Sequence, residues 1–165
     1  MQTLNEEIKS LYGGRVRVRV SGIYLEDERI LLVNHSLYGH DFWSPPGGGI
    51  NFGETAEAAL KREIKEETGL EAQTGKFLFV SEHIDADLHA IELFFEIQSV
   101  QGEIGKGIDP EMSADHQIIE DVQLMKLEQV QILPDGHYHS VLGKVSSLEE
   151  LFRLNPFLSG LEGKA

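Results

Sequence analysis

Three glutamates on one predicted helix, Glu63, Glu66 and Glu67, are the residues best placed to do chemistry. The pattern from 55 to 68 is helical, and about 100° per residue brings the three carboxylates onto one face. The same face carries Ala56, Ala59 and Leu60 one and two turns earlier. Three like charges on an inward face are costly unless a cation neutralises them. Mg²⁺ or Mn²⁺ would do so, because hard cations take carboxylate oxygens as ligands.

A second interpretation stays open, in which these glutamates form a solvated acidic face that Arg62 and Lys65 balance. Two features favour the cation site. The opposite face of the helix already carries Lys61, Lys65 and Thr68, which accounts for a solvent side. The run 45–49, Pro-Pro-Gly-Gly-Gly, precedes the helix, and its small residues let the backbone approach a ligand closely. A carbonyl oxygen from this run could complete a metal shell.

The elements around this helix are mostly strands. Alternation and short apolar runs predict strands at 15–20, 22–25, 30–33, 76–83, 89–100 and 116–127. Further helices are expected at 4–11, at 128–133 and from 146 to 154, where Ser146 and Glu149 match a capping box. Loops are expected at 34–53 and 102–115, and Gly69 is expected to end the glutamate helix. The pattern predicts an α/β (α+β) fold with a mixed β-sheet sandwiched between helices.

Composition limits the class of protein. The chain has 165 residues, no cysteine, and 14 Lys+Arg against 28 Asp+Glu, which gives a formal net charge of −14. This length predicts a single domain over 1–165. Apolar runs of four residues predict no membrane span, and the excess of acids predicts no nucleic-acid coating. The lack of cysteine excludes disulfides and thiolate chemistry, and we expect a cytoplasmic protein.

One stretch of the chain resembles a known family signature. Gly48, five residues, Glu54 and seven residues precede Arg62-Glu63-Ile64-Lys65-Glu66-Glu67-Thr68-Gly69-Leu70. This stretch, Gly48 to Leu70, resembles a complete Nudix box, with every fixed position filled. The resemblance implies a Nudix fold and a hydrolase that uses a divalent metal and water to cleave a nucleoside diphosphate linked to a moiety X.

The resemblance also implies roles for single residues. Glu63, Glu66 and Glu67 would hold Mg²⁺ (Mn²⁺ is possible), with the carbonyl of Gly47 as a further ligand. Arg62 would position a glutamate, Glu54 would stabilise the loop–helix junction, and Gly48 and Gly69 would serve backbone geometry. Glu66 or Glu63 is the expected general base. Because the family sometimes takes its base from a later loop, three more acids are open candidates: Glu111, Asp115 and Glu120.

The substrate is less defined by the sequence. The family's downstream markers for ADP-ribose and dinucleoside polyphosphates are absent from 85–88, which leaves nucleoside triphosphates and nucleotide sugar or alcohol diphosphates. Arg17 and Arg19 share one face of the first strand and could bind a phosphate or a base edge, with Arg19 preferred. The alternative is that these arginines lie on a solvent-exposed sheet face.

An active enzyme is favoured over a catalytically weak Nudix-like nucleotide-binding or regulatory module, because the three glutamates of the box are intact. The expected partner is a small-molecule nucleotide substrate. By the same resemblance, a homodimer is possible.

Overall fold

The computed structural model describes residues 6, 9–10, 13–37, 39–85, 88–110, 112 and 117–159. Most of the helix predicted at 4–11 lies outside these residues, although the described positions 6, 9 and 10 are helical. Two of the candidate bases, Glu111 and Asp115, also lie outside them.

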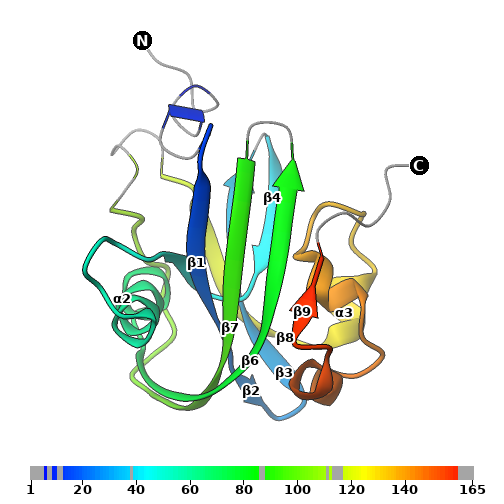
Figure 1. Cartoon of the computed structure of the whole chain (residues 1–165). Coiled ribbons are helices and arrows are strands. Elements are labelled where there is room, and N and C mark those ends of the chain that lie inside the picture. The colour runs from blue at the N-terminus through cyan, green and yellow to red at the C-terminus, as the bar shows by residue number, and fades with distance from the viewer. Residues whose placement is uncertain are drawn as a thin grey trace.

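The strands form two sheets (Figure 1). The first sheet has five strands in the order β5 (Gly47–Gly49), β1 (Val16–Ile23), β7 (Leu88–Gln101), β6 (Glu71–Asp85) and β9 (Phe157–Leu158). The second has four strands, in which β3 (Arg29–Leu37) pairs with β2 (Leu25–Glu26), β4 (His40–Ser44) and β8 (Ile119–Met125). The pairing of β1 with β7 is parallel and that of β6 with β7 antiparallel, so the first sheet is mixed, as predicted.

The helices flank these sheets. Helix α2 (Ala56–Thr68) lies on one side and α3 (Leu127–Gln131) on the other (Figure 1), together with the 3₁₀ helices η2 (Ser140–Gly143) and η3 (Leu148–Arg153). The predicted fold class is therefore confirmed, although the strands divide between two sheets. In the described part of the chain, no helix is long and apolar enough to cross a membrane.

Two local predictions were wrong. The segment 34–53 is not a continuous loop, because it holds the end of β3 and the short strands β4 and β5. The last helix is a 3₁₀ helix that begins at Leu148, and its N-cap Ser147 makes no side-chain capping bond. The backbone N–H of Ser146 instead donates to Glu150 (2.8 Å), so the expected capping box does not form.

Helix α2 has well-defined ends and a buried face. The Thr55 hydroxyl accepts the N–H of Ala58, and Gly69 adopts the left-handed conformation (φ 77°) that ends a helix. Leu60 and Ile64 pack into a core cluster with Val20 of β1 and Ile97 of β7, among others. Thr68, expected on the solvent side, is fully buried, and its hydroxyl donates to the carbonyl of Ile64 (2.6 Å). This anchoring turns the glutamates toward β5 and β3.

Candidate active site

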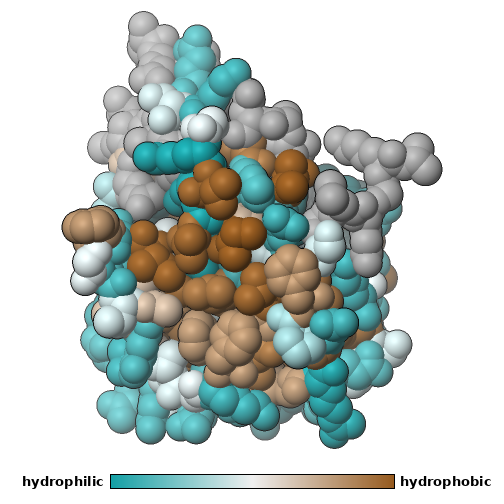
Figure 2. Space-filling view, in the orientation of Figure 1, coloured by the Kyte–Doolittle hydropathy of each residue, from teal (hydrophilic) through white to brown (hydrophobic). Residues whose placement is uncertain are grey.

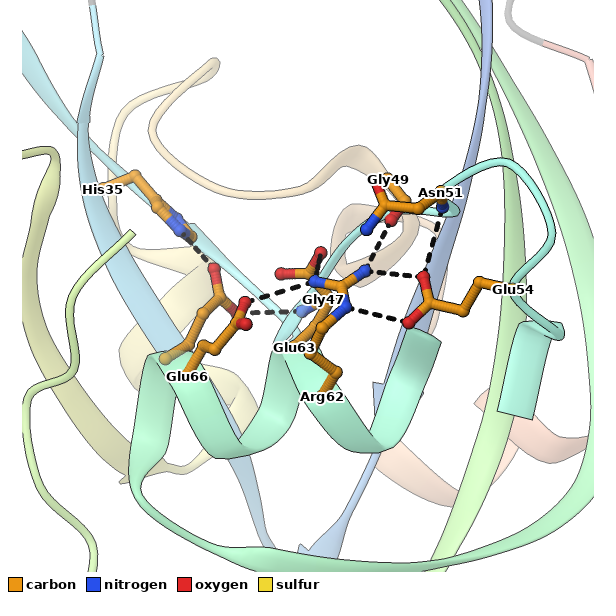
Figure 3. A network of polar contacts seen from close by, with 9 residues as sticks. His35, Gly47, Gly49, Asn51, Glu54, Arg62, Glu63 and Glu66 are labelled. Atoms are coloured by element: carbon orange, nitrogen blue, oxygen red, sulfur yellow. Dashed lines mark hydrogen bonds and ion pairs between the residues drawn. The ribbon is translucent and has the colours of Figure 1, made fainter. Parts of the chain in front are cut away.

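Arg62 is the centre of the polar network at α2 (Figure 3). Its guanidinium donates to both carboxylate oxygens of Glu54 (Nε–Oε1 2.9 Å, Nη2–Oε2 2.8 Å) and to the carbonyl of Gly49 (3.0 Å). Nη1 donates to Glu63 Oε1 (2.7 Å) and to Glu66 Oε2 (3.2 Å). One guanidinium therefore joins the loop before the helix to two glutamates on it.

Glu54 connects the loop to the helix, as the resemblance implied, through Arg62 and through a backbone N–H. Besides the paired bonds from Arg62, its Oε2 accepts the backbone N–H of Asn51 (3.1 Å). The hydrogen bond from Arg62 lowers the pKa of Glu54, so the carboxylate form is favoured.

Glu67 is held by two donors from outside the helix. The backbone N–H of Gly47 donates to Oε2 (2.9 Å), and Nε2 of His35 lies 2.9 Å from Oε1. Both Glu67 and His35 are largely buried. His35 carries no local signal in the sequence, because it comes from β3 and only the assembly of the two sheets brings it to α2 (Figure 3).

Burial shifts the titration of Glu63. Desolvation raises its pKa, Arg62 opposes this, and the neighbouring charges of Glu67 and Glu66 raise it again, to about 7 in all. A buried carboxyl beside two others thus holds its proton more tightly than a surface glutamate does. The interpretation of a solvated acidic face is wrong for Glu63 and Glu67, which are only 8% and 6% exposed.

Without metal, the free energy of unfolding is expected to fall as the pH rises from about 4.5 to about 7. A carboxyl with a higher pKa in the folded state stabilises the fold below the unfolded pKa, and this effect is lost as the pH passes through the folded pKa. The loss due to Glu63 should be roughly 2–3 kcal/mol. Urea unfolding in the presence of a chelator should show this loss of stability in wild type and in the control Glu71→Gln, which changes an exposed glutamate. Glu63→Gln should not show it. The same pH slope in Glu63→Gln would contradict the assignment.

Two glycines of β5 leave room for their neighbours. A Cβ atom on Gly48 would collide with the carboxyl of Glu63, so this glycine admits the glutamate to the loop. A Cβ atom on Gly47 would collide with the main-chain carbonyl oxygen of Val20 and with Ser21 on the paired strand. Gly48 therefore makes room for a side chain, whereas Gly47 makes room for the sheet itself.

Alanine at these two positions should have different effects. Gly47→Ala is expected to lower the free energy of unfolding by about 2–3 kcal/mol, because main-chain atoms must move. Gly48→Ala should cost less than about 1 kcal/mol, because the end of the Glu63 side chain can swing away, but it should displace that carboxylate. Denaturant unfolding of both variants should show that Gly47→Ala is the less stable of the two. Equal free energies of unfolding would contradict this prediction.

The carboxylate and carbonyl oxygens near α2 are suitable ligands for a hard divalent cation. Nη1 of Arg62 contacts Glu63 and Glu66 together, which places oxygens of these two carboxylates close to each other. Carboxylate oxygens and a glycine carbonyl are the ligands that Mg²⁺ prefers. Within the described residues no three acidic or histidine side chains already converge as a metal cage, because Arg62 lies between two of them. These oxygen ligands could surround a cation after either Arg62 or the carboxylates move.

Arg19 belongs to a second polar cluster, on the face of β1 that points between the sheets. Its Nε lies 3.9 Å from Oε1 of Glu92, which is buried on the paired strand β7. The Ser21 hydroxyl donates to the same oxygen, and Nε2 of His139 lies 2.9 Å from the other. The Nδ1 atom of His139 accepts the N–H of Val141 (3.3 Å), so the ring proton lies on Nε2 and is donated to Glu92.

The cluster adjoins the site at α2 through β5. Arg19 is paired with Gly49, and Ser21 with Gly47, the residue that donates to Glu67. The alternative interpretation, in which Arg19 lies on a solvent-exposed sheet face, therefore does not hold, because its side chain is only 30% exposed and lies beside the buried Glu92. Arg17 lies two residues earlier on the same face and is half-buried. Glu120, the described candidate base, is half-exposed and pairs with Lys106 (3.5 Å).

Comparison with known proteins agrees with this geometry. A family model for the NUDIX domain matches residues 15–142. The ADP-ribose pyrophosphatase of Methanocaldococcus jannaschii is 35% identical over 127 residues, which cover 66% of this chain and 74% of that protein. The RNA pyrophosphohydrolase of Histophilus somni is 50% identical over 46 residues, which cover 28% of this chain and only 24% of that protein.

Solved structures give the same result. A MutT NUDIX hydrolase from Burkholderia pseudomallei matches with a TM-score of 0.63 at 27% identity, over 81% of this chain and 100% of that one. A NUDIX hydrolase from Nitrosomonas europaea gives a TM-score of 0.65 at 19% identity, over 84% of this chain and 89% of that one, and shows the shared fold alone. The chain belongs to the Nudix hydrolase family. The resemblance carried by residues 48–70 is thus confirmed.

Proposed function

We propose that this chain is a Mg²⁺-dependent hydrolase (Mn²⁺ being an alternative metal) that cleaves the pyrophosphate bond of a nucleoside diphosphate linked to X. The observation that carries the proposal is the convergence of the Nudix-box residues on one guanidinium. Arg62 contacts Glu54, Glu63, Glu66 and Gly49, while Glu67 is held beside them by Gly47. A signature that is complete in the sequence is therefore also assembled in space.

The residues have distinct roles in this proposal. Glu63, Glu66, Glu67 and the carbonyl of Gly47 would hold the cation, which when bound neutralises diphosphate charge and acidifies water. Arg62 positions Glu63 and Glu66 through the bonds already described. Glu66 is the proposed general base, because its side chain is 27% exposed against 10% for Glu63, so water can reach it. In this role, a carboxylate oxygen of Glu66 that does not bind the cation would take the proton of the attacking water.

Arg19 is the proposed contact for the anionic part of the substrate, with Arg17 beside it. The support is its pairing with Gly49 next to the glutamate site and its partial exposure (30%). A planar guanidinium can bind a phosphate through paired N–H groups.

Nucleotide sugars are the first candidates for X. The relative from Methanocaldococcus jannaschii is named an ADP-ribose pyrophosphatase, and ADP-ribose is a nucleoside diphosphate joined to a sugar. The sequence left this chemical class open, although it lacks the family's marker for ADP-ribose itself. Nucleoside triphosphates and alcohol diphosphates remain in the test panel for the same reason.

Chromatographic analysis of products tests the proposal. The protein is incubated with Mg²⁺ and, separately, ADP-ribose, other nucleotide sugars, nucleoside triphosphates or CDP-alcohols. We expect hydrolysis of one class, abolished by a chelator and by Glu67→Gln. Absence of turnover across the panel, combined with tight binding of one class, would replace this proposal with a nucleotide-binding or regulatory module. The cytoplasmic location stays a prediction.

A further inference from the structure

The last turn of α2 carries two of the three proposed carboxylate ligands, Glu66 and Glu67. The last four carbonyl groups of a helix have no hydrogen-bond partner within it. The same end of a helix is the negative end of its dipole, so carboxylates there are unfavourable. Without donors from outside the helix, this turn would fray and its two carboxylates would lose their fixed positions.

Apolar packing holds the earlier turns of α2 in place. Leu60 and Ile64 lie in one core cluster with residues of β1 and β7. Figure 2 shows hydrophobic side chains gathered over the strands of the five-stranded sheet, beside α2. The last turn is different, because Glu66 and Glu67 bring charged groups and no apolar surface to such packing. Its position therefore depends on polar contacts.

The chain after β7 supplies the missing donors. The N–H of Gly107 donates to the carbonyl of Glu67 (3.0 Å), and the N–H of Ile108 donates to the carbonyl of Glu66 (3.2 Å). We call residues 107–109 the capping segment. The main chain of both proposed ligands is thus bound by a segment that lies about 40 residues further along the sequence.

Gly107 allows this close approach. A Cβ atom at this position would lie 1.7 Å from the carbonyl oxygen of Glu66 and 2.7 Å from the carbonyl carbons of Glu66 and Glu67. These are main-chain atoms, which cannot swing aside as the end of a side chain can. Gly105, two residues earlier, has open space where its Cβ atom would be, although its N–H also bonds α2, at the carbonyl of Thr68 (2.9 Å).

Gln117 fixes the other end of the capping segment. Its side-chain oxygen accepts the N–H of Asp109 (2.8 Å), and its amide nitrogen donates to the carbonyls of Asp109 (3.0 Å) and Met112 (3.2 Å). Gln117 lies two residues before β8 begins at Ile119. The end of α2 is therefore connected, through the capping segment and one glutamine, to the edge of the second sheet.

We propose that Gly107 and Gln117 are positioning residues for the metal site, because the capping segment that they place holds the main chain of Glu66 and Glu67. Neither residue touches the cation or the substrate in this role. The inference rests on the proposed function, since it assigns a task only if these carboxylates bind a cation. The bound cation and the capping segment would order the same turn, so each should strengthen the other.

The first test is calorimetric titration of the full chain with Mg²⁺. Gly107→Ala should raise the dissociation constant of Mg²⁺ at least ~10-fold, as the loss of a contact that orients metal ligands ordinarily does. The matched control is Gly105→Ala, the same substitution in the same loop, where the added methyl group meets no atom and the backbone N–H is kept. Its dissociation constant should stay within about twofold of wild type. Circular dichroism shows whether each variant is folded.

The second test uses Gln117→Met, which keeps the length of the side chain and removes its hydrogen bonds. It should raise the dissociation constant of Mg²⁺ about 5-fold, whereas Gln123→Met, at an exposed position of β8, should leave it unchanged. In wild type, Mg²⁺ should slow hydrogen exchange of the Gly107 and Ile108 amides at least ~5-fold. A merely structural contact would not respond to the cation in this way.

The outcomes separate this inference from the proposed function. Wild-type protein that binds neither Mg²⁺ nor Mn²⁺ would refute both. Wild-type binding that a folded Gly107→Ala and Gln117→Met both retain would overturn the positioning role alone. If Gly107→Ala does not fold, Gln117→Met and the exchange of the two amides decide the question.

Discussion

Glu67→Gln is expected to lower kcat/KM at least about 100-fold at saturating Mg²⁺. Each carboxylate oxygen of Glu67 is held by its own partner, Gly47 N–H on one side and His35 on the other. Glutamine has a single oxygen, so one of these contacts is lost and an amide N–H₂ group faces a donor. The substitution also removes one negative charge from the proposed metal ligands. Steady-state kinetics and calorimetric titration with Mg²⁺ measure the two effects separately.

Glu66→Gln should cause a loss of similar size, because it removes both a ligand and the proposed base. The matched control is Glu57→Gln in the first turn of α2, outside the network, where an exposed glutamate pairs with Lys61 (2.8 Å). Its rate should stay within about twofold of wild type. Near-wild-type rates for both Glu66→Gln and Glu67→Gln would remove the basis of the assignment.

Glu92→Gln is expected to lower the free energy of unfolding by about 3 kcal/mol. Glu92 is a buried carboxylate that accepts from Ser21 and His139 and lies beside the guanidinium of Arg19. The neutral amide removes the negative charge that Glu92 places beside Arg19. The control is Glu82→Gln on β6, which has a single histidine partner and should cost less than about 1 kcal/mol. Equal losses of free energy of unfolding in the two variants would show that Glu92 forms no stabilising buried ion pair.

The pH dependence of the free energy of unfolding at acid pH provides an independent measure of how much the Glu92 carboxylate stabilises the fold. Burial raises its pKa, but His139, Arg19 and Ser21 outweigh burial and lower it to about 2. A carboxyl with a lowered folded pKa stabilises the fold above its ordinary value near 4.5, and this effect is lost as the pH falls toward 2. In Glu92→Gln, the free energy of unfolding should therefore depend less on pH below about 4.5. In Glu63→Gln, the change should instead appear in its pH dependence between about pH 4.5 and about pH 7.

Local patterns were enough to predict α2, its end at Gly69 and the two strands on either side of 26–28. The helical spacing of the apolar residues and glutamates on one face and the glycine at the helix end are all local signals. The turn of the hairpin has two residues, Asp27 and Glu28, both with positive φ, which suits a tight connection between β2 and β3. The Nudix box identified most of the site for the same reason, since its members lie within 23 residues of one another.

The rest of the site depends on contacts between distant segments. Strand β5 consists of three glycines, which carry no side-chain pattern, and it exists because it pairs with β1. His35 reaches Glu67 over 32 positions of sequence, and His139 reaches Glu92 over 47. No periodicity within a single element encodes such pairs, so only the packed sheets reveal them.

The alternation in β1 and β7 was visible in the sequence, but its direction was not. Apolar alternate residues ordinarily face the core, yet Val18 and Ile91 face outward here, while Arg19 and Glu92 face inward. The ion pair makes this arrangement possible, because each buried charge has a partner. An apolar outer surface is the geometric result of placing charged side chains next to the candidate active site.

The strict alternation of β1 makes its length critical. Successive side chains point to opposite faces, so inserting or deleting a single residue between Val16 and Arg19 would exchange the two faces of the strand's first half. Arg17 would then emerge on the apolar surface, and a valine would take its inward place next to Arg19. One-residue insertions and deletions should therefore be far less tolerated here than substitutions, because each would disturb the inner charge pair and the outer surface together.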